Sequence, residues 1–141
     1  MAVTADLLLA VSVKSESGNV IRIANTDHES HEMREFDIPL DKEVEIDSSQ
    51  HEWSNYFKCG LRAATQLLAK KRKDEKFRSV GMDIMVDGTV PSGGGLSSSA
   101  AFVCASALAV LKANGEEKVE KKELTELAIV SERAVGVNSG G

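Results

Sequence analysis

The sequence predicts an α+β fold, with strands in the first part of the chain and helices after them. Residues 7–40 hold short apolar or alternating runs separated by turn residues, which is typical of strands. Later segments either repeat apolar residues at three- and four-residue spacing or are apolar almost throughout, as packed helices are. The 141 residues are 42% hydrophobic and 28% charged. They match one ordinary domain of ~100–150 residues with enough apolar matter for a core.

Charge and hydropathy exclude several classes of protein. The 17 basic and 22 acidic residues give a net charge of -5, which argues against a broad nucleic-acid-binding surface. The longest apolar run, residues 100–111, is too short to cross ~30 Å of hydrocarbon. The first residues also lack the pattern of a secretory signal. We therefore expect a cytoplasmic protein without nucleic-acid or membrane partners. We expect Cys59 and Cys104 to be buried thiols, with a disulfide as the less favoured alternative.

The first strand is expected at residues 7–13, buried on at least one face. A turn at residues 17–19 then predicts a hairpin with a returning strand at 20–24. Phe36 to Leu40 is expected to end a third strand, where Pro39 suits an edge or an end. A further strand is expected at 82–86. Asp83 and Asp87 there share one side, but alternation alone does not show which side.

Three helices are expected. The first ends in the cations Lys70–Lys73, which favour a helix C-terminus. Its apolar residues recur at three- and four-residue spacing and form one stripe: Trp53, Tyr56, Phe57, Leu61, Ala64, Leu67 and Leu68. A nucleic-acid or nuclear-import patch is the weaker interpretation of these cations, because Asp74 and Glu75 follow at once. The second helix is the apolar run near residues 100–111. The third runs from about 120 to 135, with Gly136 placed to cap it.

The segment from Val90 to Ala101 predicts a phosphate-binding loop that opens a helix. Its three consecutive glycines, Gly93–Gly95, carry no Cβ, so a phosphate can approach the backbone closely. The serines that follow lie where the helix begins, and there the first N–H groups and the helix dipole attract an anion. A serine hydroxyl can also reach a Mg²⁺ bound to phosphate.

Other interpretations of this segment fail on spacing. A Walker A loop requires GxxxxGK followed by Ser or Thr, and the segment has no lysine. A dinucleotide fingerprint would need glycine at Ser98, and a nucleophile elbow would need glycine at Ser99. A flexible Gly/Ser linker or a helix C-cap feature is the structural alternative, but a linker would not run directly into an apolar helix.

The stretch from Pro91 to Ala101 resembles the nucleotide motif of the GHMP kinase superfamily, in the form typical of galactokinases. Residues 52–60 are similar to the galactokinase helix that begins Trp-x-Asn-Tyr, and residues 132–141 to the run before the catalytic Met-Asp-Gln. Among galactokinases, the sequence as a whole most resembles the fungal ones. The resemblance implies an incomplete GHMP kinase N-terminal domain, whose fold is ribosomal protein S5 domain 2-like.

The resemblance also implies an activity, the transfer of the ATP γ-phosphate to the anomeric hydroxyl of galactose, giving galactose 1-phosphate. It implies small-molecule substrates and a monomeric parent protein. The site residues it implies are Gly93, Gly94, Gly95, Ser97, Ser98 and Ser99 for ATP, Ser99 and Glu132 for Mg²⁺, and Ser139 and Gly140 for the sugar. The alternatives are a non-catalytic galactose and ATP sensor that regulates transcription, or an N-acetylgalactosamine kinase.

The residues themselves give some support for Glu132. It lies four residues after Ala128, on or beside the expected inward stripe of the last helix, and a carboxylate there needs a partner such as Mg²⁺. A rim glutamate paired with a lysine is the alternative. His28 and His31 lie three residues apart in a polar stretch, where a surface loop is far better supported than a metal site.

The chain ends look internal to a longer sequence, because a turn signal at residues 139–141 has nothing after it. We expect residues 1–141 to be a partial ATP-binding domain. The family's catalytic Arg and Gly-Glu-His segment would lie before Met1, and its catalytic Asp and C-terminal domain after Gly141.

The isolated 141-residue chain is therefore expected to lack kinase activity, since phosphoryl transfer relies on groups that it does not match. A coupled assay of ADP release with galactose and MgATP checks this. Galactose-dependent turnover at an ordinary enzyme rate would contradict it.

Overall fold

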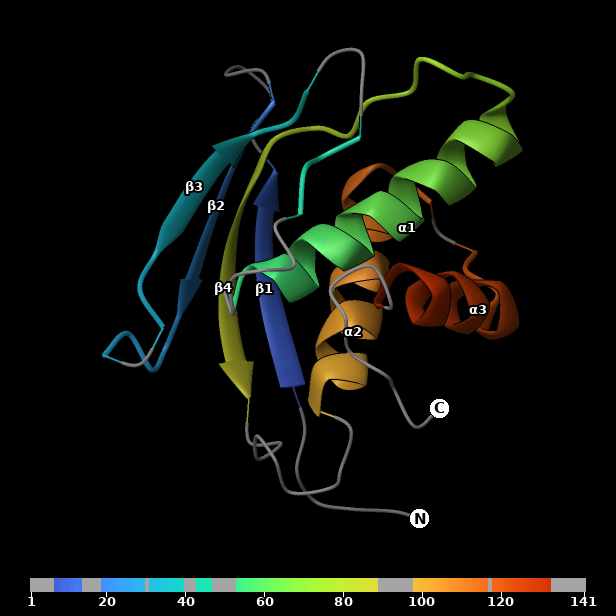
Figure 1. Cartoon of the computed structure of the whole chain (residues 1–141). Helices are drawn as coiled ribbons and strands as arrows, with labels where there is room; N and C mark the ends of the chain where they lie inside the picture. The colour runs from blue at the N-terminus through green and yellow to red at the C-terminus, as the bar shows by residue number, and fades with distance from the viewer. Residues whose placement is uncertain are drawn as a thin grey trace.

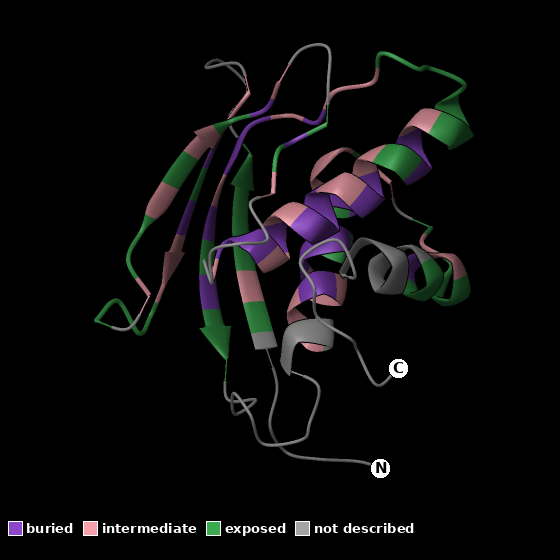
Figure 2. Ribbon diagram, viewed as in Figure 1, coloured by how far each residue is buried: buried purple, intermediate pink, exposed green. Residues whose placement is uncertain are grey.

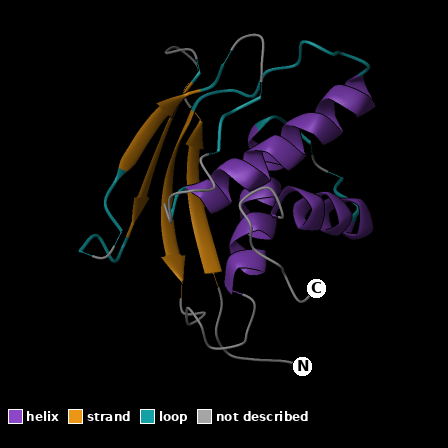
Figure 3. Ribbon diagram, viewed as in Figure 1, coloured by secondary structure: helices purple, strands orange, loops and turns teal. Residues whose placement is uncertain are grey.

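A computed structural model describes residues 7–13, 19–29, 31–39, 43–46, 53–88, 98–116 and 118–132. In order, its elements are β1 (Leu7–Val13), β2 (Val20–Asn25), β3 (Arg34–Asp37), α1 (Asn55–Arg72), β4 (Met82–Gly88), α2 (Ser98–Ala113) and α3 (Lys121–Glu132). They form two layers, a four-stranded sheet and a set of three helices on one of its faces (Figures 1 and 3). The α+β class is confirmed, although β4 lies between two helices in the sequence.

The strand order is β1-β4-β2-β3. β4 is antiparallel to β1 and parallel to β2, while β2 and β3 are antiparallel. The hairpin expected between residues 7–13 and 20–24 is therefore wrong, because β4 is inserted between these strands. Its apolar side chains explain the central place, since Met82, Ile84 and Val86 are all buried under the helices. β3 is an edge strand that ends before Pro39, earlier than expected.

The core lies between the sheet and the helices (Figure 2). The parallel register sets Ile21 beside Met82 and Ile23 beside Ile84, so that both strands present apolar side chains to the helical layer. The helices contribute side chains to the same core that are also fully buried, namely Phe57, Leu68, Val110 and Leu111.

The expected burial of β1 is wrong for most of the strand. Leu9 packs against the core, but Val11 and Val13 on the same face are 36% and 47% exposed, and Leu8 on the other face is 59% exposed. β1 is an edge strand with β4 on one side, and α2 packs against it.

The helix predictions are confirmed where the structure describes them. α1 ends at Arg72, and Lys73 follows in the left-handed region with φ 52°. The cations of its last turn contact the protein itself: Lys71 Nζ lies 3.6 Å from a carboxylate oxygen of Glu123, and Arg72 donates a 2.7 Å hydrogen bond to the carbonyl of Asn114. Gly136 lies outside the described residues. No helix in the described part of the chain has both the length and the apolar character to cross a bilayer.

The two cysteines differ in burial. Cys59 is fully buried beside Val103, as expected, whereas Cys104 is only half-buried. Both are thiols in the structure.

α1 and α2 approach each other closely at Gly60. A Cβ added there would stand 2.6 Å from Cβ of Ser106, 2.7 Å from the nitrogen of Ala107 and 2.8 Å from the carbonyl oxygen of Val103. Two of these three atoms belong to the backbone of α2 and cannot turn aside. Glycine is therefore required here by the distance between two helices.

Gly60→Ala is expected to destabilise the fold by about 1–3 kcal/mol, because overpacking must push the two helices apart. In an exposed helix the same change would stabilise by roughly 0.5–1 kcal/mol. Urea unfolding of the two proteins measures the sign.

The control repeats this comparison in a Ser106→Gly background, with and without Gly60→Ala. Most of the loss should persist in this background, since the backbone atoms of α2 remain. Full rescue by Ser106→Gly would contradict a backbone clash.

Candidate functional site

The expected phosphate segment connects two described elements that meet at one end of the molecule. β2 and β4 are parallel, so their carboxyl ends lie at the same edge of the sheet, and α2 begins at that end too (Figure 1). Residues 89–97 link β4 to α2 and lie outside the described residues, so Gly93, Gly94, Gly95 and Ser97 remain predicted phosphate contacts. The carboxyl edge of parallel strands is where ligands commonly bind in α/β sheets.

Ser98 and Ser99 are the first two residues of α2. This confirms that Ser98 and Ser99 lie where the helix begins. The helix has 16 residues, and its first turn contains no acidic residue that would repel an anion. The side chains of both serines lie outside the described part, so their contacts with ATP and Mg²⁺ remain predictions.

Three aromatic side chains meet beside the first turns of α2. The ring centroids of Trp53 and Phe102 are 6.2 Å apart, and those of Tyr56 and Phe102 are 6.1 Å apart. All three residues are half-buried. The rings are tilted by 39° and 35° against Phe102. An aromatic cluster next to a helix N-terminus suits a ligand with a planar ring and a phosphate chain.

Sequence reasoning missed this aromatic cluster of Trp53, Tyr56 and Phe102 as a site. It used Trp53 and Tyr56 as part of an apolar stripe and as marks of resemblance. One feature of the sequence could have indicated the cluster: the single tryptophan and the single tyrosine of the chain lie three residues apart. Their meeting with Phe102 depends on how α1 packs against α2, which no local pattern contains.

The acidic residues of β4 do not face the helical layer. Met82, Ile84 and Val86 occupy that face, so alternation puts Asp83 and Asp87 on the open face of the sheet. Asp87 accepts a 2.8 Å hydrogen bond from the hydroxyl of Thr26. The structure thus settles the side that the sequence left open.

Glu132 is the last residue of α3. α3 packs on both α1 and α2, which places it in the same helical layer as Ser99. The side chain of Glu132 is not among the described ones, and Ser139 and Gly140 lie outside the described residues. Within the described residues, no group of three histidine, cysteine or acidic side chains is placed to hold a metal.

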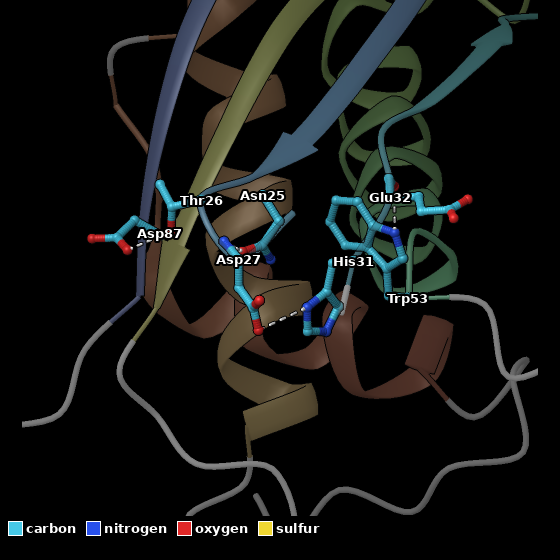
Figure 4. A network of polar contacts seen from close by, with 7 residues as sticks. All are labelled: Asn25, Thr26, Asp27, His31, Glu32, Trp53 and Asp87. Carbon is cyan, nitrogen blue, oxygen red and sulfur yellow. Dashed lines mark hydrogen bonds and ion pairs between the residues drawn. The ribbon is translucent and has the colours of Figure 1, made fainter. Parts of the chain in front are cut away.

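The two histidines of the polar stretch lie in the connection between β2 and β3, as expected. His28 is exposed, whereas His31 is half-buried against Trp53 with ring centroids 5.5 Å apart (Figure 4). His31 Nδ1 also lies 3.7 Å from a carboxylate oxygen of Asp27.

Comparison with known proteins gives the family. The family described as GHMP kinases N terminal domain matches residues 55–141. This match begins with α1 and includes β4, α2, α3 and the Gly/Ser segment. The chain belongs to the GHMP kinase N-terminal domain family.

Within this family, the curated relatives are galactokinases, which confirms the resemblance to them. The chain is 47% identical over its full length to the galactokinase of Candida parapsilosis, of which it covers 27%. It is 46% identical to the galactokinase of Saccharomyces cerevisiae, covering 28% of that protein, and again the whole of this chain is aligned. The chain thus spans between a quarter and a third of the length of these relatives.

Solved structures of kinases also share the fold of this chain. A galactokinase of Lactococcus lactis complexed with galactose superposes with a TM-score of 0.71 at 25% identity, covering 97% of this chain and 32% of that one. A mevalonate kinase of Methanococcus jannaschii gives a TM-score of 0.73 at 15% identity, covering 94% of this chain and 38% of the other. The second likeness concerns the fold alone.

Proposed function

We propose that the chain is the nucleotide-binding part of a galactokinase, which transfers the γ-phosphate of ATP to the anomeric hydroxyl of galactose. The observation that carries this proposal is the likeness to fungal galactokinases along the entire chain, at 47% and 46% identity. We also assign the protein to the cytoplasm and expect it to act as a monomer.

The geometry of the described residues supports a nucleotide as the ligand. The half-buried aromatic cluster is an apolar surface against which a purine would pack, and the start of α2 offers N–H groups and a positive dipole end for phosphates. Phe102 belongs to the cluster and lies four residues after Ser98, the first residue of α2. In this proposal the base lies against the cluster and the phosphates lie against Gly93–Gly95 and Ser97–Ser99.

Mg²⁺ fits the residues proposed for it by their chemistry. Ser99 and Glu132 supply a hydroxyl and a carboxylate, the oxygen donors that this ion prefers. When bound, the ion neutralises the charge that develops on the transferred phosphoryl group. Ser139 and Gly140 are proposed to contact the sugar, while the catalytic Asp and Arg of the family match no residue of this sequence.

Nucleotide binding can be measured on the chain itself, because Trp53 is its single tryptophan and lies in the proposed site. Titration with MgATP should change its fluorescence and saturate. Glu132→Gln should weaken MgATP binding about tenfold, the loss expected for one charged contact. ATP in the presence of EDTA should bind both proteins equally.

Glu126→Gln is the matched control, since Glu126 is an exposed glutamate of the same helix. Equal affinity of the Glu132 and Glu126 variants for MgATP would contradict the assignment of the metal ligand.

The activity is tested by a chimera in which this chain replaces the matching segment of the Candida parapsilosis galactokinase. Because the chain aligns with that enzyme over its full length, the chimera should retain galactose-dependent ADP release. A folded chimera that binds both galactose and MgATP but releases no ADP would argue for a sensor instead of an enzyme.

A further inference from the structure

The connection between β2 and β3, described at residues 26–29 and 31–33, is fixed at its first end to β4. The backbone N–H of Thr26 donates a 2.9 Å hydrogen bond to the carbonyl of Val86, and its hydroxyl donates a 2.8 Å bond to Asp87. β4 is the strand that precedes the Gly/Ser segment in the sequence. The first end of the connection is therefore hydrogen-bonded to the strand that leads to the predicted phosphate contacts.

The turn itself is held by its own polar groups. The N–H of Asp27 donates a 2.9 Å hydrogen bond to the side-chain oxygen of Asn25, and the N–H of His31 donates a 3.0 Å bond to the carbonyl of Asp27. The Asp27 carboxylate also lies 3.7 Å from His31 Nδ1. These contacts bring the imidazole of His31 back toward α1 (Figure 4).

At its second end the connection holds Trp53 in two ways. The imidazole of His31 meets the indole at an interplanar angle of 79°, an edge-to-face contact. The indole Nε1–H donates a 2.9 Å hydrogen bond to the carbonyl of Glu32. A ring contact and a hydrogen bond on the same side chain fix both the place and the rotation of the indole (Figure 4).

We propose that this connection is a clasp for Trp53 and that His31 is a positioning residue for the purine base of the bound nucleoside triphosphate. This inference rests on the proposed function, because the indole held by His31 is the one that packs on Phe102 in the aromatic cluster. An indole fixed before binding loses less rotational freedom when a base stacks on it. The clasp also ties the place of the base to β4, and so to the strand that precedes the phosphate segment.

The test compares His31→Ala, His31→Phe and His28→Ala with the unmodified chain. His28 is the matched control, since it is an exposed histidine of the same connection. Acrylamide quenching of the single tryptophan without nucleotide reports on the clasp, and calorimetry with MgATP and with magnesium triphosphate separates the base from the phosphates.

We expect His31→Ala to increase the quenching of Trp53 and to weaken MgATP binding about threefold to tenfold, the scale of one lost aromatic pair. Its affinity for inorganic triphosphate should not change, because that ligand has no base. His31→Phe retains an aromatic edge and should keep most of the MgATP affinity. His28→Ala should match the unmodified chain in every measurement.

The proposal is overturned if His31→Ala binds MgATP as tightly as His28→Ala does, even though the unmodified chain binds it well. It is also overturned if His31→Ala loses affinity for ATP and triphosphate equally, since that result indicates a general loss of structure. If the unmodified chain binds neither ligand, the proposed function fails and this inference fails with it.

Discussion

The contact between α1 and α2 at Gly60 determines the geometry of the candidate site. Gly60 lets the backbone of α1 approach the backbone of α2 at Ser106 and Ala107. One turn earlier on each helix stand Tyr56 and Phe102, whose rings meet 6.1 Å apart. The aromatic cluster is therefore a direct consequence of how closely the two helices pack. Trp53 joins it from just before α1, so the helix contact and the β2–β3 connection act on the same group of rings.

Local patterns in the sequence predicted local structure well. The apolar stripe around Phe57 and Leu61 predicted α1, and the cations after it marked its end, because both features depend on helical periodicity and the helix dipole. The serines before the apolar run predicted where α2 begins, and the structure has its first residue at Ser98. These features involve residues within a few positions of one another, where spacing determines which side chains can meet.

Pairings between distant segments could not be predicted in the same way. A hairpin of residues 7–13 with 20–24 follows from the turn between them, but β4 joins the sheet from sixty residues further on and separates the two strands. The same limit applies to the site. The sequence contains Trp53, Tyr56 and Phe102, yet their contact depends on the packing of two helices, and the side taken by Asp83 and Asp87 depends on which face the helices cover.

Placement of charge resolves an apparent conflict between an acidic chain and an anionic ligand. The net charge of -5 would repel ATP if the acidic groups surrounded the site. On β4 they instead lie on the open face of the sheet, whereas the first turn of α2 has no acidic side chain. The local field at the helix start can thus be positive while the whole chain is negative.

The exposed edge of the sheet has a consequence for handling the protein. β1 pairs with β4 on one side, contains no charged residue, and exposes Leu8, Val11 and Val13 to solvent. Natural sheets usually protect such edges with lysine, proline or a bulge, because an uncharged edge is a template for another strand. The described part of β1 has none of these gatekeepers. Intermolecular aggregation in concentrated samples should therefore begin at this strand.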